Sequence, residues 1–204
     1  MSEKIEAKEN LKPKELKNIS SKQVEYHFDT HYKGYVTKIN EIWGKLENAD
    51  RSKANQNYSD FRELKVEESF NLMGVVLHEY YFENLSSTEN KISENMKKAI
   101  INDFGSFEKW LEDFKAVGTA FRGWSILAFD LNIGKLRNYG ADAHNMYGIW
   151  NAIPVLVLDV YEHAYYTDFG PKRAPYMDAF INNINWSVVE KRYTKSLNAY
   201  AALK

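Results

Sequence analysis

Cysteine is absent from all 204 residues of this sequence. Its absence excludes disulfide frameworks, zinc sites built on cysteine, iron–sulfur clusters and thiol catalysis. Any metal ion that the chain binds must therefore be held by nitrogen and oxygen ligands.

An excess of charge of one sign is also lacking, because 27 Lys and Arg face 28 Asp and Glu and the formal net charge is -1. This balance gives no electrostatic reason to expect a nucleic acid or a membrane surface as a partner. No run approaches the roughly 18 apolar residues of a membrane-spanning helix, and the charged first 20 residues lack the apolar stretch of a secretory signal. We therefore expect a cytoplasmic protein.

What is present is a globular composition with 44% hydrophobic residues, arranged at helical spacing in the first half of the chain. Residues 1–19 form a polar leader that we expect to be mobile or loosely docked. Apolar residues then recur at intervals of three and four over 20–46, where Ser20 and Gln23 resemble a capping box. A second helix is predicted over 66–85, and the two should pair as an antiparallel hairpin.

The second half of the chain changes its hydrophobic period. Short apolar runs predict three strands, at 124–129, 135–139 and 153–158. Helices are expected around them, beginning at Ser86 or Ser87, after Ser106, and at 176–185 and 188–201. The predicted class is α+β: a long helical hairpin over 20–88, followed by an α/β domain over 89–204 with a small three-stranded antiparallel sheet.

Five histidines are the main candidates for chemistry: His27, His31, His78, His144 and His163. His27, His31 and Tyr35 are spaced by four residues and share one helix face. Asp159 directly follows an apolar strand, and His163 comes four residues later. Imidazoles with a carboxylate suit iron, manganese or zinc. A single helical histidine is more often structural than a ligand, so spacing alone leaves a metal site and unrelated histidines both open.

Four separated segments resemble the iron/manganese superoxide dismutase family, whose signature is D-x-W-E-H-A-x-Y. The segments are HFDTHYKGYV at 27–36, HEYYFENLS at 78–86, DVYEHAYY at 159–166 and FINNINW at 180–186. The similarity covers about residues 20 to 195. It implies an enzyme that converts superoxide to dioxygen and hydrogen peroxide through one iron or manganese ion. The ion must change oxidation state, which excludes zinc.

The resemblance implies that His27, His78, Asp159 and His163 ligate this ion, with water or hydroxide in a fifth position. Three neutral imidazoles and one carboxylate would leave the centre net positive, which favours an anionic substrate. Iron is expected, although manganese or either metal is compatible with this ligand set.

The resemblance also assigns roles to neighbouring residues. His31 and Tyr35 match a gateway pair that lines the substrate funnel, with Tyr35 joining a hydrogen-bond network to bound solvent. Glu162 and Tyr166 match residues that reach the metal site of a second subunit. The expected assembly is therefore a homodimer, or a tetramer built from it.

His144 is the most informative departure from the family pattern. It lies 15 residues before Asp159, in the loop position where many members have a glutamine, and the alternative helix position for that glutamine is Gly74. We expect Gly74 to leave room and His144 to tune the potential of the metal, as in a subset of the family that uses iron or either metal. The alternative is an ordinary histidine on a surface loop.

Some aromatic residues of the family are replaced. Tyr161, Phe82 and Ile181 stand where tryptophans are common. Arg173 stands where the family has an arginine, either near the substrate mouth or as a surface charge. The lighter aromatic shell keeps open a dismutase-like metal-binding protein with little or no catalytic activity. An oxygen-using iron protein is a further alternative, but its facial triad of two histidines and one carboxylate has fewer ligands.

Overall fold

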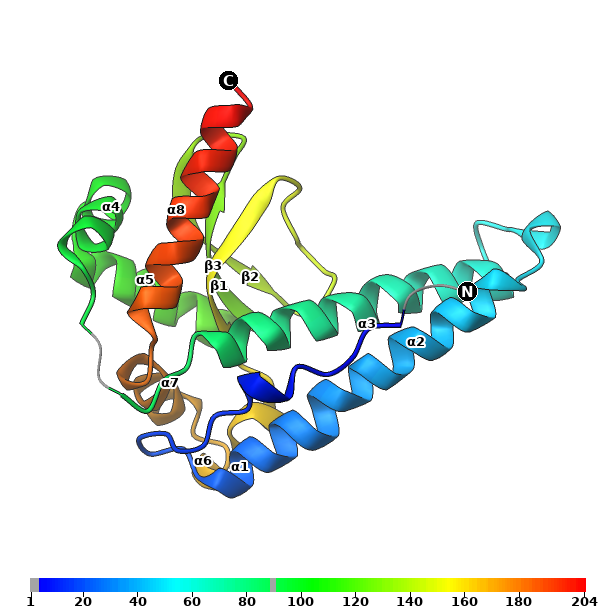
Figure 1. The fold of residues 1–204 in the computed structure, drawn as a ribbon, viewed down its shortest axis with the longest axis horizontal. Helices are drawn as coiled ribbons and strands as arrows, with labels where there is room; N and C mark the ends of the chain where they lie inside the picture. The colour runs from blue at the N-terminus through cyan, green and yellow to red at the C-terminus, as the bar shows by residue number, and fades with distance from the viewer. Residues whose placement is uncertain (1–3, 89–90) are drawn as a thin grey trace.

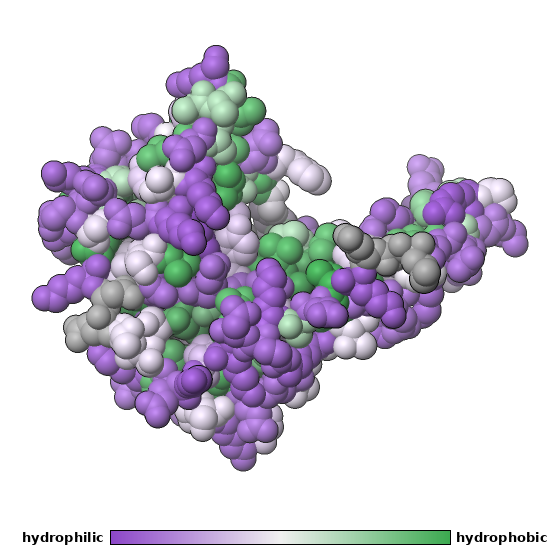
Figure 2. Space-filling model, viewed as in Figure 1, coloured by the Kyte–Doolittle hydropathy of each residue, from purple (hydrophilic) through white to green (hydrophobic). Residues whose placement is uncertain are grey.

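The computed structural model describes residues 4–88 and 91–204 (Figure 1). Helices α2 and α3 form a long hairpin that projects from a body in which further helices pack around a small sheet. The visible surface is largely hydrophilic, with hydrophobic side chains gathered where α3 meets the body (Figure 2). No helix within the described ranges is long and apolar enough to cross a membrane.

The first helical run covers the predicted residues, but it is not a continuous α-helix. It consists of α1 (Ser21–Glu25), a π-helical segment (Tyr26–Tyr32) and α2 (Lys33–Glu47). The Ser20 side chain accepts a hydrogen bond from the Gln23 backbone at 3.1 Å, as a cap should. The predicted reciprocal half of the capping box is wrong, because the Ser20 backbone N–H donates to Asp168 instead.

The second helix, α3 (Asp60–Glu83), starts earlier than predicted because Ser59 caps it. Helix α5 (Phe107–Ala120) is capped by Ser106, as predicted. Helix α4 (Glu94–Phe104) is capped by Ser93, so the expected start at Ser86 or Ser87 is wrong. The physical reason is that the Ser86 N–H pairs with the Asn183 carbonyl at 2.8 Å, which keeps this segment extended.

The predicted three-stranded antiparallel sheet is confirmed. It contains β1 (Trp124–Asp130), β2 (Lys135–Ala141) and β3 (Ala152–Asp159), in the order β2-β1-β3. Residues 155–158 of β3 are completely buried, and α3, α5 and α8 pack against the strands. The register pairs Trp124 with Asp159, which places both residues at one end of the sheet. The remaining helices are α6 (Tyr166–Phe169), α7 (Arg173–Asn182) and α8 (Trp186–Ala202).

The described part of the leader, residues 4–19, is docked and contains a short 3-10 helix (Glu9–Leu11). The Ile5 backbone exchanges two hydrogen bonds with the Asn40 amide, and the Lys8 N–H donates to the Tyr32 hydroxyl at 2.9 Å. Ile19 is only 4% exposed. Of the two expectations, a mobile or a loosely docked leader, these contacts agree with a docked one, because polar side chains of the first helix hydrogen-bond its backbone.

Candidate metal centre

Four side chains from four elements converge at the base of the hairpin. His27 comes from the π-helical segment, His78 from α3, Asp159 from the end of β3, and His163 from a short 3-10 helix (Glu162–Ala164). Their candidate ligand atoms all lie within 4.8 Å of one another. The structure thus brings together the four residues that were predicted from the sequence as metal ligands.

The distances within this cluster suit ligands of one ion. The Nε2 atoms of His27 and His163 each lie 3.1 Å from Asp159 Oδ2, and His78 Nε2 lies 3.5 Å from it. Two ligands at about 2.1 Å from an ion, separated by angles of about 90–120°, would be about 3.0–3.6 Å apart. The spacing therefore fits a shared first-row metal ion.

The protonation of His78 leaves one lone pair free for a metal. Its Nδ1 lies 2.6 Å from the Gly74 carbonyl, one helical turn earlier. A carbonyl only accepts hydrogen bonds, so Nδ1 carries the proton and Nε2 does not. His78 Nε2 is buried and has no hydrogen-bond partner in the described structure. A metal ion would satisfy this atom, and the carbonyl behind the ring fixes its tautomer as metal sites require.

Asp159 is fully buried, and its Oδ1 and its backbone carbonyl oxygen both accept hydrogen bonds from the protein. Its Oδ1 accepts from the Tyr161 N–H at 2.9 Å, and its backbone carbonyl accepts from the Tyr176 hydroxyl at 2.8 Å. Burial alone would raise the pKa of Asp159, but the imidazoles of His163 and His27 hold that pKa well below its usual value. Only Oδ2 is left to face the histidines.

Burial also sets the charge of the imidazoles. It lowers the pKa of His27, and it lowers the pKa of His78 well below the ordinary value. Neutral imidazoles and an ionised carboxylate are the forms that bind metals. At neutral pH, His27 and His78 are therefore neutral and Asp159 is ionised, as metal ligands should be.

His31 and Tyr35 both border the cluster. The His31 ring stacks on His163 with centroids 4.1 Å apart, and the Tyr35 ring lies 5.2 Å from that of His78. A Cβ added to Gly74 would lie 2.8 Å from Tyr35 Cδ1. Gly74 therefore leaves room, and the ring that occupies this room is that of Tyr35, whose centroid lies 4.7 Å from that of His144.

His144 is buried beside the cluster rather than on the surface, so the surface-loop alternative is wrong. Its Nδ1 accepts from Trp124 Nε1 at 3.0 Å. Because an indole nitrogen can only donate, neutral His144 must carry its proton on Nε2. That Nε2 is buried without a hydrogen-bond partner in the part of the chain that the structure describes. Burial lowers the pKa of His144 to about 4, which keeps the ring neutral.

The altered aromatic positions still contribute side chains to the site. Tyr161 stacks on His163 with centroids 5.2 Å apart, and Phe82 lies 4.9 Å from the His27 ring. Ile181 packs against the core.

Arg173 is not a free surface charge, because its guanidinium donates to the carbonyls of Gly118 and Phe121 at the end of α5.

The sequence did not reveal the contacts by which three side chains support the candidate ligands and His144. Gln23 reaches the carbonyl of His163, Tyr176 holds the carbonyl of Asp159, and Trp124 fixes His144. Spacing gave a signal only for Gln23, which lies one helical turn before His27.

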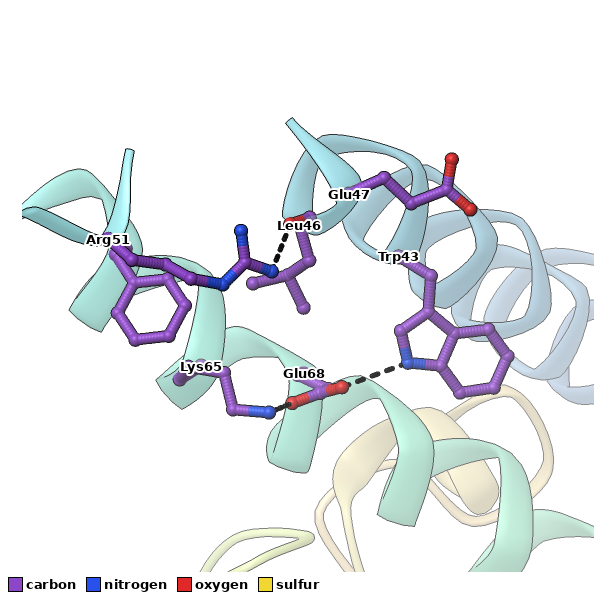
Figure 3. A pocket seen from close by; sticks show the side chains of 7 residues that line it. Trp43, Leu46, Glu47, Arg51, Lys65 and Glu68 are labelled. Atoms are coloured by element: carbon purple, nitrogen blue, oxygen red, sulfur yellow. Dashed lines mark hydrogen bonds and ion pairs between the residues drawn. The ribbon is translucent and has the colours of Figure 1, made fainter. Parts of the chain in front are cut away.

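A separate pocket lies along the outer part of the hairpin (Figure 3). Trp43 Nε1 donates to Glu68 Oε1 at 3.0 Å, and Lys65 pairs with the same carboxylate. Arg51 donates to the Leu46 carbonyl at 2.9 Å. No histidine lines this pocket, and its charged groups already have partners, so it is no competitor for the metal.

Comparison with known proteins gives matches over nearly the whole chain. The family model described as iron/manganese superoxide dismutases, alpha-hairpin domain, matches residues 7–86, and the corresponding C-terminal domain matches 92–192. Fe superoxide dismutases of Aquifex pyrophilus and Aquifex aeolicus are each 54% identical over 98% of this chain and 96% of their own length. A Mn superoxide dismutase of Haloarcula marismortui is 34% identical over 90% of this chain and 89% of its own.

Proposed function

Because this chain belongs to the iron/manganese superoxide dismutase family, we propose that its buried cluster of three histidines and one aspartate is the catalytic centre of a superoxide dismutase. The enzyme converts superoxide to dioxygen and hydrogen peroxide. The observation that carries this conclusion is the convergence of His27, His78, Asp159 and His163 in a chain that matches both domains of the family.

When bound, an iron or manganese ion supplies the one-electron chemistry that oxidises one superoxide to dioxygen and reduces a second, with two protons, to hydrogen peroxide. The residues define where that chemistry occurs. Three neutral imidazoles and the Asp159 carboxylate offset only one positive charge of such an ion, so the centre attracts an anion. The names of the Aquifex relatives and the presence of His144 support iron, with manganese or either metal as a compatible cofactor.

The roles proposed for the neighbouring residues follow from their contacts. The N–H on His144 Nε2 is buried and has no hydrogen-bond partner among the described residues, so it is available to solvent at the metal. Burial raises the pKa of Tyr35, so its hydroxyl keeps its proton and can donate it in a hydrogen bond. His31 is stacked on a ligand and only partly buried, which suits a residue at the entrance.

The proposed assembly is a homodimer, or a tetramer built from it. Glu162 and Tyr166 flank the ligand His163 on both sides, and Glu162 is exposed while Tyr166 is 51% exposed. Their exposure leaves both side chains available to a second subunit, as the resemblance to the family implies. Contact with a second subunit would bury both side chains next to its metal site.

Two further points belong to this proposal. The chain divides into a hairpin unit at 20–88 and an α/β unit at 89–204, behind the leader 1–19. The family matches, which end at residue 86 and resume at 92, support this boundary. The location is cytoplasmic, which fractionation of cells producing the protein would test.

The decisive experiment is superoxide dismutation by metal-stripped protein reloaded separately with iron and with manganese, each sample checked for metal content. Activity with one or both metals is expected. Full loading with both metals and no activity would contradict the proposal and leave a dismutase-like metal-binding protein.

The ligand assignment has its own test in His78→Ala. This change removes the only imidazole that α3 supplies, so we expect loss of the metal and of activity together. Metal content after dialysis and the dismutation rate are the measurements, with thermal unfolding as the check on folding. A fully active His78→Ala protein would refute the assignment.

A further inference from the structure

The first turn of α1 contains a buried amide that is hydrogen-bonded to the backbone of one of the proposed ligand residues. Gln23 is 1% exposed and precedes His27 by four residues, so it lies one turn below that ligand on the same helical run. Burial of a glutamine is unfavourable unless its donor and acceptor are both satisfied. The hydrogen-bond partners of the Gln23 amide therefore show which segments of the chain it connects.

Both ends of the Gln23 amide are bonded to the segment that carries His163. The Nε2 group donates to the His163 carbonyl at 2.6 Å, and Oε1 accepts from the Thr167 N–H at 3.1 Å. These contacts join residues 140 and 144 positions apart in the chain. One side chain thus spans from the helix of one ligand to the backbone of another.

A second contact closes the same junction. The Asp168 carboxylate accepts from the backbone N–H of Ser20 at 2.7 Å and from its hydroxyl at 2.6 Å. The segment 163–168 is therefore held at two points by the start of α1. Because His27 and His163 both lie 3.1 Å from Asp159 Oδ2, a shift of this segment would change the spacing of two nitrogen ligands.

We propose that Gln23 is a positioning residue that sets the orientation of His163 relative to His27. This inference rests on the ligand assignment in the proposed function. Gln23 acts through the His163 carbonyl, since that bond is the shorter of the two and fixes the ligand's own residue. Supporting groups of this kind typically influence metal affinity by about 10-fold to 100-fold.

Gln23→Met tests the proposal with a side chain of similar length that favours helix but makes no hydrogen bonds. We expect the iron-loaded variant to release iron to a chelator about 10-fold to 100-fold faster, and the spectrum of its ferric form to change. Gln23→Glu separates the two bonds, because a carboxylate accepts from Thr167 but cannot donate to His163. It should release iron as fast as Gln23→Met.

Asn183→Leu is the matched control. Asn183 is also 1% exposed, and both ends of its amide hydrogen-bond the backbone of Lys17 instead of that of a proposed ligand residue. It should unfold at a lower temperature while keeping wild-type iron release and spectrum. Wild-type iron release and spectrum in Gln23→Met would overturn the proposal, and wild-type values in Gln23→Glu alone would assign the effect to Thr167 instead of His163.

These readouts are independent of catalysis. A wild-type protein that binds iron and manganese without dismutase activity would refute the proposed function, yet iron release from the Gln23 variants would still decide whether this residue positions His163.

Discussion

In two of the histidines, His78 and His144, a single hydrogen bond decides which ring nitrogen carries the proton. The Gly74 carbonyl fixes the proton of His78 on Nδ1, and the Trp124 indole fixes the proton of His144 on Nε2. The two rings, whose centroids are 5.7 Å apart, therefore differ in what they offer: His78 has a lone pair on Nε2, and His144 has a hydrogen-bond donor on Nε2. This difference supports the proposed roles, in which His78 is a ligand and His144 tunes the environment of the metal.

Trp124→Phe should alter the enzyme without removing its metal. The change deletes the donor to His144 Nδ1, so the proton is no longer confined to Nε2. We expect activity to fall about tenfold with metal content retained. The matched control is Trp110→Phe, because Trp110 is equally buried and its indole nitrogen has no partner within the described residues. Equal losses in both variants would show that packing, not the tautomer of His144, causes the effect.

At the scale of elements, an asparagine joins the hairpin to the sheet. Asn84, just after α3, donates to the Val157 carbonyl at 3.0 Å and accepts from the Val157 N–H at 3.1 Å. It thereby pairs with the free edge of β3, as a neighbouring strand would. Arg192 of α8 donates to the same amide oxygen at 2.9 Å. These hydrogen bonds fix the helix that carries His78 relative to the strand that ends in Asp159.

Asn84→Ala should destabilise the protein by about 2–4 kcal/mol, since it leaves the buried N–H and carbonyl of Val157 without partners. The measurement is the free energy of unfolding from denaturant titration. Asn102→Ala, on the exposed side of α4, is the control and should have little effect. A loss below about 0.5 kcal/mol at Asn84 would mean that the edge of β3 does not depend on this residue.

At the scale of the whole molecule, the proposed dimer depends on residues next to the metal centre. Glu162→Ala should shift the protein towards monomer, because it removes a charged group from the proposed contact with the partner subunit. Sedimentation velocity at several concentrations measures this shift. Glu112→Ala, which changes an exposed glutamate on α5, is the control. An unchanged dimer in Glu162→Ala would place the interface elsewhere.

The stability of the metal-free protein should depend on pH through its buried histidines. Burial lowers the pKa of His31 and of His144 to about 4, from an ordinary value of 6.5. The unfolded chain therefore binds more protons than the folded chain between these values, and the free energy of unfolding should fall as pH is lowered from 6.5 to about 4. Denaturant midpoints across this range measure the slope, and His144→Gln should reduce it. A flat profile would contradict the assigned burial effect.

The sequence by itself determined the elements and the chemical type of the site. Helical and strand periods predicted the hairpin and the three strands, because each period follows from which face of an element is buried. The helix starts depended on more than the local sequence. Ser86 and Ser106 are equally good caps by sequence, but only Ser106 is used, since Ser86 pairs with Asn183 from a distant part of the chain.

Only the tertiary structure decided how the site is supported. The motifs named His27, His78, Asp159 and His163, whereas the fold supplied the Gln23 amide that holds His163 from a helix 140 residues away. It also decided that the room left by Gly74 is taken by the ring of Tyr35. Local spacing carries information about one helix or strand, but these contacts depend on how separate elements pack, and so no pattern within one element could reveal them.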